Sequence, residues 1–228
     1  MLPRRWRQTV RATRCQYSDW QYELWTDERM KRYVDERHPR LAPIFHGFER
    51  GIMRADVIRY AVLFDLGGLY CDLDYEFLRP YDFTGTGLVL SKEFDSRYGD
   101  GVDQIANYVM ASEPGHPFWK DVLEELISNP PRTRSYDDVV YATGPGLLTR
   151  IFQRHAARYE NVRLTERPVL SPYRLRCQNE RQHMLNSMET YGFHHASGAW
   201  KERWTLLYLR RRATKFIWGL PSRGKMAA

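Results

Sequence analysis

The chain has 228 residues, of which 43% are hydrophobic and 14% aromatic. This is enough apolar material for one packed core, and it excludes a wholly disordered chain. The mean hydropathy is −0.63 and no long apolar run occurs, so the sequence predicts no membrane-spanning helix. The opening residues 1–7 (MLPRRWR) lack the apolar stretch of a secretion signal, which predicts a cytoplasmic location.

The charge is distributed unevenly along the chain. The formal net charge is +7, and residues 201–228 alone hold eight basic residues and one acidic residue. The first 200 residues therefore sum to zero. We expect a globular domain over residues 1–200 and a basic, aromatic tail over residues 201–228. Three cysteines without a C-x-x-C spacing argue against a disulfide framework or a zinc site.

Alternating patterns and turn residues predict strands separated by helices, and so an α/β fold. The alternation from Trp20 to Trp25 predicts a half-buried strand. Thr26 is typical of a helix N-cap, and the helix that follows should end at His38-Pro39. Further strands are expected at 69–73, 88–90, 162–164 and 191–194, with helices over 50–66, from His116-Pro117 to Ile127, and from Gly144-Pro145-Gly146 to about His155.

Asp56 and Arg59 stand in the middle of the helix expected over 50–66, among residues that are mostly apolar. Asp56 and Arg59 are three residues apart and so share one face. A buried ion pair with no further duty is the simplest interpretation, because structural pairs outnumber catalytic ones. Gly67-Gly68 should end the helix, since glycine adopts the left-handed conformation without a Cβ penalty.

The residues after the glycines add a second pair of charges. Asp72, in the strand expected over 69–73, and Asp74, directly after that strand, are two apart and should point to the same side if the extended conformation continues. The helix rises about 15 Å from Asp56 to its end, and the strand returns about 10 Å, so Arg59 should lie near both aspartates. Paired carboxylates favour a divalent cation such as Mg²⁺ or Mn²⁺, which commonly also binds substrate phosphates.

The larger pattern resembles the D-x-D sugar-binding region of glycosyltransferase family 32. The resemblance runs from Ala55-Asp56-Val57-Ile58-Arg59-Tyr60 to Gly67-Gly68-Leu69-Tyr70-Cys71-Asp72-Leu73-Asp74, and continues through residues 107–118, Thr143-Gly144-Pro145 and His194-His195-Ala196-Ser197-Gly198-Ala199-Trp200. It implies a single-domain, GT-A-like nucleotide-sugar fold with a mixed sheet. It also implies a retaining, metal-dependent transfer of a hexose from a nucleoside-diphosphate sugar to a glycan or lipid hydroxyl.

The resemblance assigns roles residue by residue. Asp72 and Asp74 are expected to be the catalytic pair, and Asp74 and His195 to bind the metal. A histidine ligand favours Mn²⁺ over Mg²⁺. The residues expected to bind substrate are Asp56, Arg59, Tyr70, Asn107 and Trp200.

Structural alternatives stand beside several of these roles. Asn107 could cap a turn, and His195 or Trp200 could be ordinary packing residues. His194 should point the other way from His195 if the segment is a strand, which favours a structural role for it. The chain departs from the family pattern in lacking the usual first strand of the nucleotide site at its N-terminus, and in having Ala199 where serine is common.

Two other functions remain open from the sequence. A D-x-D phosphohydrolase is one, although Tyr75 occupies the position where such enzymes carry Thr or Val, and a degenerate, non-catalytic sugar-nucleotide-binding relative is the other. For a transferase, no residue can be nominated as a covalent nucleophile, so we expect front-face displacement. The tail over 201–228 is expected to form a basic helix that can contact an anionic membrane peripherally, with a solvated surface or a nucleic-acid contact of the tail as the alternatives. For the chain as a whole no nucleic-acid partner is expected.

Overall fold

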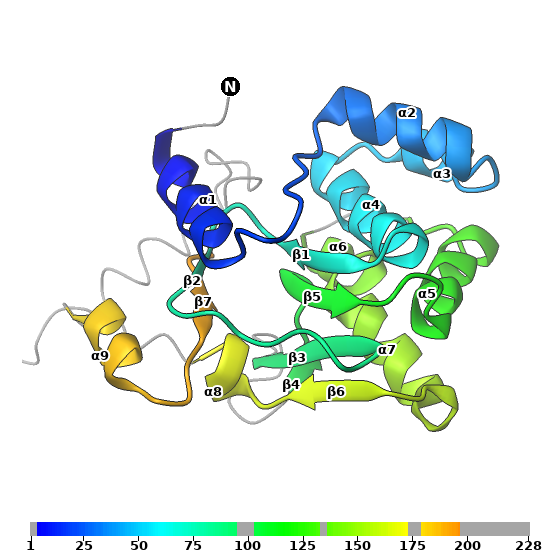
Figure 1. Ribbon diagram of the computed structural model, residues 1–228. Helices are drawn as coiled ribbons and strands as arrows, with labels where there is room; N and C mark the ends of the chain where they lie inside the picture. Colours follow the sequence, from blue (N-terminus) through cyan, green and yellow to red (C-terminus); the bar gives the residue numbers. More distant parts are fainter. Residues whose placement is uncertain (1–3, 95–102, 133–135, 173–178, 197–228) are drawn as a thin grey trace, which may run out of the picture. The chain divides into compact units, whose positions relative to one another are not determined.

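The computed structural model describes residues 4–94, 103–132, 136–172 and 179–196, which form a mixed α/β unit (Figure 1). The basic tail, Trp200 and the boundary expected near residue 200 lie outside these residues. The helices are α1 (Arg4–Gln16), α2 (Asp27–Arg37), α3 (Ala42–Gly47), α4 (Gly51–Asp65), α5 (Pro117–Ser128), α6 (Tyr136–Ala142), α7 (Pro145–His155), η1 (Ala156–Arg158), α8 (Arg167–Leu170) and α9 (Glu180–Asn186). The strands are β1 (Gly68–Cys71), β2 (Tyr75–Phe77), β3 (Leu88–Phe94), β4 (Asp103–Ile105), β5 (Val109–Ser112), β6 (Val162–Thr165) and β7 (Gly192–His194).

The strands form two sheets. The larger has the order β1-β5-β3-β4, with β6 also pairing with β3, and the smaller is the ribbon β2-β7. The β3–β6 pair is parallel, whereas the other pairs are antiparallel. The expected mixed sheet is therefore confirmed. In the described residues before β1 the chain forms helices and loops, beginning with α1.

The main core lies where α4, α5 and α7 pack beside the larger sheet. Trp119 of α5 stacks on Tyr60 of α4 with ring centroids 5.7 Å apart, and both side chains are fully buried. A smaller apolar cluster lies between the ribbon, β5 and the loop after β2, and includes Tyr75, Phe77 and Tyr108. The site described below lies where the two sheets meet.

Several expected elements are confirmed close to their expected bounds. Thr26 accepts a hydrogen bond from the Arg29 N–H and so caps α2. Gly67 follows α4 with a positive φ of 67°, and a Cβ there would lie 2.6 Å from the carbonyl oxygen of Ser112. Only glycine fits this close approach without displacing the backbone.

The strand expected at Trp20–Trp25 is wrong. Residues 21–26 have no ladder partner, and the Trp25 ring instead packs edge-on against Tyr33 of α2 with centroids 4.9 Å apart. The aromatic alternation therefore serves helix packing rather than a sheet. Within the described residues, no helix is long and apolar enough to span a bilayer.

Candidate functional site

The two aspartates occupy the turn that joins the sheets, and not a strand as expected. β1 ends at Cys71, and the Tyr75 N–H donates to the Asp72 carbonyl oxygen at 2.9 Å, which closes a four-residue turn. The Asp72 N–H still donates to the Tyr108 carbonyl oxygen at 2.9 Å, so the turn is tied to the end of β5. The expected period-two alternation therefore breaks at Asp72, yet both carboxylates reach one point.

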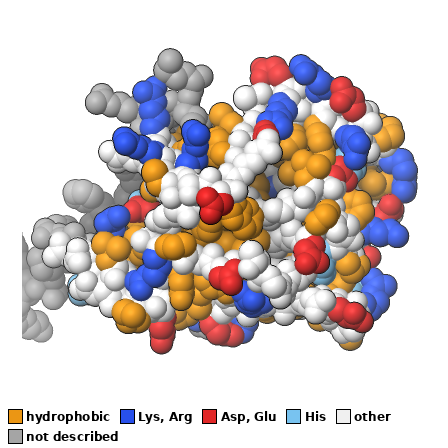
Figure 2. Space-filling view, in the orientation of Figure 1, with side chains coloured by type: hydrophobic (Ala, Val, Ile, Leu, Met, Phe, Trp, Pro, Cys, Tyr) orange, Lys and Arg blue, Asp and Glu red, His pale blue; other side chains and the backbone are white. Residues whose placement is uncertain are grey.

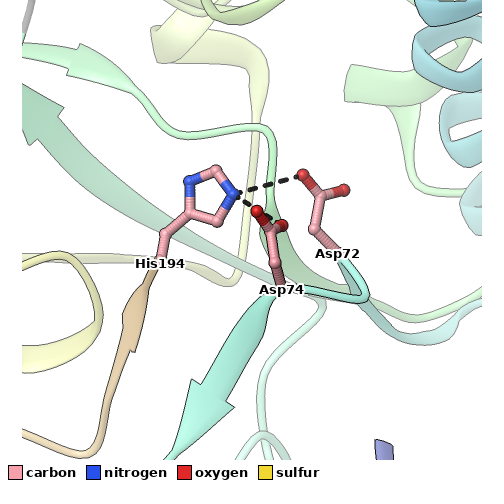
Figure 3. Close-up of side chains that lie close together, drawn as sticks. All are labelled: Asp72, Asp74 and His194. Carbon is pink, nitrogen blue, oxygen red and sulfur yellow. Dashed lines mark hydrogen bonds and ion pairs between the residues drawn. The ribbon is translucent and has the colours of Figure 1, made fainter. Parts of the chain in front are cut away.

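His194 of β7 completes this group (Figure 3). Its Nε2 lies 3.0 Å from Asp74 Oδ1 and 3.6 Å from Asp72 Oδ2. One ligand atom from each of the three residues lies within 4.8 Å of the others, and all three residues are half-buried. The Tyr108 ring stacks on the imidazole with centroids 4.2 Å apart, which restricts its orientation.

The structure places His194 beside the aspartates, whereas the resemblance assigned that position to His195. In the ribbon, His194 pairs with Tyr75, and neighbouring residues of a strand point to opposite sides. His195 Nε2 instead lies 2.9 Å from Glu76 Oε2. Burial disfavours the charge on Glu76, but hydrogen bonds from His195 and Arg181 outweigh burial and lower its pKa. The expectation that His195 faces Asp74 is therefore wrong.

A buried cluster lies behind the aspartate turn. Asp56 and Arg59 of α4 are each 3% exposed, and Arg59 Nη2 lies 3.2 Å from Asp56 Oδ1. Asp56 also accepts hydrogen bonds from Asn107 Nδ2 at 3.0 Å and Thr143 Oγ1 at 2.8 Å. Burial raises the pKa of Asp56 to about 6, despite the opposing effects of Arg59 and these donors.

Arg59 connects this cluster to the turn. Its Nη1 lies 3.1 Å from Asp72 Oδ1 and donates to the Asn107 carbonyl oxygen at 2.5 Å. Tyr70 also donates to Asp72 Oδ1, at 2.7 Å, and the guanidinium lies 4.7 Å from its ring centroid. Burial alone would lower the pKa of Arg59, but Tyr70, Asp72 and Asp56 raise it, so the guanidinium stays charged.

Most of the residues expected at the site do lie together. Asp56, Arg59 and Asn107 form the buried cluster, and Tyr70 and Asp72 lie between it and the turn. Asp56 and Arg59 contact the other members of the cluster, so their expected direct contact with a sugar stays a prediction. Trp200 lies outside the described residues. The sequence did not predict that the His194 side chain lies on the same face of the ribbon as the aspartates, because this depends on the register of β7 with β2. It also assigned no role to Tyr108 or Thr143.

The group formed by Asp72, Asp74 and His194 fits a divalent transition-metal cation. It offers two carboxylates and one imidazole, a donor set that suits Mn²⁺ better than Mg²⁺ or Ca²⁺. Asp72 Oδ1 contacts Arg59 and Tyr70, whereas its Oδ2 faces the imidazole. One oxygen of Asp72 is thus oriented by second-sphere contacts while the other points into the group, as expected of a ligand.

Comparisons with known proteins identify the region of the chain that contains the aspartate turn. Residues 3–90 match the family model described as a glycosyltransferase sugar-binding region containing a DXD motif. The chain is 31% identical over 158 residues to inositol phosphoceramide mannosyltransferase 1 of Schizosaccharomyces pombe, covering 68% of this chain and 48% of the relative. It is 23% identical over 182 residues to the initiation-specific alpha-1,6-mannosyltransferase of Candida albicans, covering 65% of this chain and 47% of the relative.

The chain belongs to glycosyltransferase family 32. It spans about half the length of these curated relatives. Among solved structures it resembles PaToxG glycosyltransferase, with a TM-score of 0.51 and 15% identity, covering 68% of this chain and 65% of that one. At that identity the structural similarity shows only the fold, which is GT-A-like. The aspartate turn lies within the residues that match the family model and corresponds to its DXD motif.

Proposed function

We propose that this chain is a metal-dependent glycosyltransferase that moves a mannose from a nucleoside-diphosphate sugar to a hydroxyl of a lipid acceptor. The observation that carries this proposal is the convergence of Asp72, Asp74 and His194 in front of the buried Asp56–Arg59 pair. The names of the relatives supply the sugar and the acceptor class, since they include inositol phosphoceramide mannosyltransferases.

In this proposal Asp74 and His194 would hold Mn²⁺, and Asp72 would contribute from the same group. A bound Mn²⁺ would neutralise the negative charge that develops on the leaving diphosphate. Arg59 holds Asp72 in place through Oδ1 and keeps a positive charge close to the donor. Asp56 and Asn107 restrict the Arg59 guanidinium from its buried side. The Asp56 carboxylate pairs with it, the Asn107 carbonyl oxygen accepts a hydrogen bond from it, and the Asn107 amide donates to Asp56.

The stereochemistry is part of the proposal. Retention through a covalent intermediate requires a carboxylate free to attack the anomeric carbon. Asp72 and Asp74 face His194, and Glu76 is paired with Arg181 and His195. We therefore propose front-face displacement, in which the departing phosphate oxygen accepts the proton of the acceptor hydroxyl. Trapping of a glycosyl-enzyme adduct would contradict it.

Metal binding tests the site residue by residue. Calorimetric titration with Mn²⁺ should show a loss of affinity of at least about tenfold in Asp74→Asn and in His194→Ala, because each removes a direct ligand. His195→Ala is the matched control, since it removes the adjacent imidazole, which lies against Glu76. Equal losses in His194→Ala and His195→Ala would refute the assignment of His194.

Donor binding tests the function itself. A thermal-shift screen of UDP- and GDP-linked hexoses with Mn²⁺ should identify a donor that stabilises the protein, with the largest shift for GDP-mannose. The shift should disappear when Mn²⁺ is chelated and in Asp74→Asn. Mannose transfer to inositol phosphoceramide in detergent is then the direct assay. Donor binding without transfer would identify a non-catalytic relative, and no response to any donor would refute the proposal.

A further inference from the structure

The outward face of α1 carries a row of arginines that the proposed site does not use. Arg7, Arg11 and Arg14 are four and three residues apart, and so lie along one side of the helix. They line a hollow of about 760 Å³ together with Trp20 and Tyr22, which are each 39% exposed. Figure 2 shows basic side chains gathered over α1, at the upper left of the view.

Contacts on the opposite side of α1 fix the direction in which this arginine row faces. Thr9 Oγ1 donates to the Leu73 carbonyl oxygen at 2.5 Å, and Gln16 Nε2 donates to the Phe77 carbonyl oxygen at 2.9 Å. The helix is thus attached to the aspartate turn and to β2. The arginine row points away from the ribbon, so the hollow is separate from the Asp72–Asp74–His194 group.

Arg11 and Arg14 place two positive charges close together on this face of α1. In the described part of the chain no carboxylate forms an ion pair with Arg11 or Arg14, and the Arg14 guanidinium lies 5.1 Å from the Tyr22 ring centroid. Like charges four residues apart on a helix repel one another. An external anion would relieve this repulsion, and guanidinium groups bind phosphate oxygens in bidentate geometry.

We propose that the arginine row of α1, with Trp20 and Tyr22, docks this protein on the phosphate headgroups of an anionic phospholipid bilayer. Arginine heads would contact the phosphates, while tryptophan and tyrosine are the side chains that favour the membrane–water interface. The hollow is lined by one helix and the segment after it, and so forms a compact patch. The proposal extends the proposed function, because a lipid acceptor lies at such a surface, but the docking can be tested without transfer.

The test is flotation of the full chain with vesicles of phosphatidylcholine, with or without phosphatidylinositol. The variant Arg11→Gln/Arg14→Gln removes two charges from the row. Since a basic residue near an anionic surface contributes about 1 kcal/mol, partitioning onto phosphatidylinositol vesicles should fall by about tenfold or more. The matched control is Arg32→Gln/Arg37→Gln, which removes two exposed arginines from α2 and should partition within about twofold of the parent.

Each outcome decides between docking and simple charge attraction. An equal fall in both double variants, or no fall in either, overturns the proposal. A loss of binding to a single-stranded RNA probe without a loss on vesicles also overturns it, in favour of a nucleic-acid partner. Trp20→Ser should weaken vesicle binding while leaving net charge unchanged, which a purely electrostatic contact would not show. The Mn²⁺ affinity of all variants should stay at the parent value, so failure here is distinguishable from failure of the proposed function.

Discussion

Replacing Arg59 by methionine tests whether the buried cluster depends on its charge. The change keeps a long side chain but removes the ion pairs with Asp56 at 3.2 Å and Asp72 at 3.1 Å. It also removes the hydrogen bonds to the carbonyl oxygens of Asn107 and Ala55. Because Asp56 is 3% exposed, the variant leaves a buried carboxylate without its cation. Breaking such a pair costs about 3–5 kcal/mol of unfolding free energy.

A second substitution separates the ion pair from the packing. The double variant Asp56→Asn/Arg59→Met has no buried charge left unpaired, and Asn can still bond to Thr143. We expect it to recover about 1–3 kcal/mol relative to Arg59→Met alone. Arg40→Met is the control for the loss of an arginine, because the Arg40–Glu124 ion pair is exposed to solvent. This substitution should lower the unfolding free energy by less than about 1 kcal/mol.

The dependence on pH has a definite sign. Burial already raises the pKa of Asp56 to about 6, and loss of Arg59 should raise it further. An unfolded aspartate titrates near about 3.9, so between that value and the folded pKa the folded state binds more protons. Stability then falls as the pH rises through this window. Above about pH 6, Asp56 still titrates in the folded variant but no longer in the parent. The unfolding free energy of the variant should therefore fall further below that of the parent, by up to about 1.4 kcal/mol per pH unit.

Urea unfolding followed by circular dichroism at about pH 5 and pH 8 measures these differences. Subtracting the parent protein removes the contribution of the titrating groups that Arg59 does not contact, which leaves the two carboxylates that lose its charge, Asp56 and Asp72. The reasoning would be refuted if Arg59→Met cost no more than Arg40→Met, or if its deficit were the same at both pH values. A double variant no more stable than Arg59→Met would show that lost packing, and not the unpaired charge, dominates.

Two further predictions concern the backbone turn and the thiols. Gly67→Ala should lower the unfolding free energy by about 2–4 kcal/mol, because the added Cβ would lie 2.6 Å from the Ser112 carbonyl oxygen. Gly85→Ala is the control, since Gly85 has a similar φ but open space around it, and this change should cost about 1 kcal/mol. Equal losses of stability in thermal unfolding would contradict this prediction. Iodoacetamide at about pH 8 should alkylate exposed Cys15 and spare Cys71 in the folded protein, since burial raises the pKa of Cys71 to about 12. Peptide mapping checks this prediction, and rapid labelling of Cys71 under native conditions would contradict it.

Local signals predicted the elements that carry the site. Thr26, Gly67 and the proline at the start of α5 mark helix ends by their own stereochemistry, and the structure places helix ends at all three. The apolar pattern of α4, together with the glycines, placed Asp56 and Arg59 on one helix face and returned the chain toward Asp72. These features depend on a few neighbouring residues, which is why the sequence alone predicts them.

Elements stabilised by distant partners were missed. β2 and β4 have three residues each, too few for an alternating pattern to stand out. α1 has no acidic residue in its first turn, and contacts with Leu73 and Phe77 hold it in place. The sequence also did not predict that the side chain of His194, and not that of His195, lies beside the aspartates. The side that a strand residue faces depends on its register with a partner more than 110 residues away, and neighbouring histidines leave that register ambiguous.

The ribbon β2-β7 also has a consequence for the dynamics of the protein. A cation shared by Asp74 and His194 would add a further link between the ends of a chain segment of about 120 residues, which the three residue pairs of the ribbon and neighbouring hydrogen bonds already join. Ligands that bind only the closed state stabilise it against local opening. Amide hydrogen exchange in Phe193 and His194 should therefore slow when Mn²⁺ is added, which would make the last described strand a reporter of occupancy at the aspartate turn.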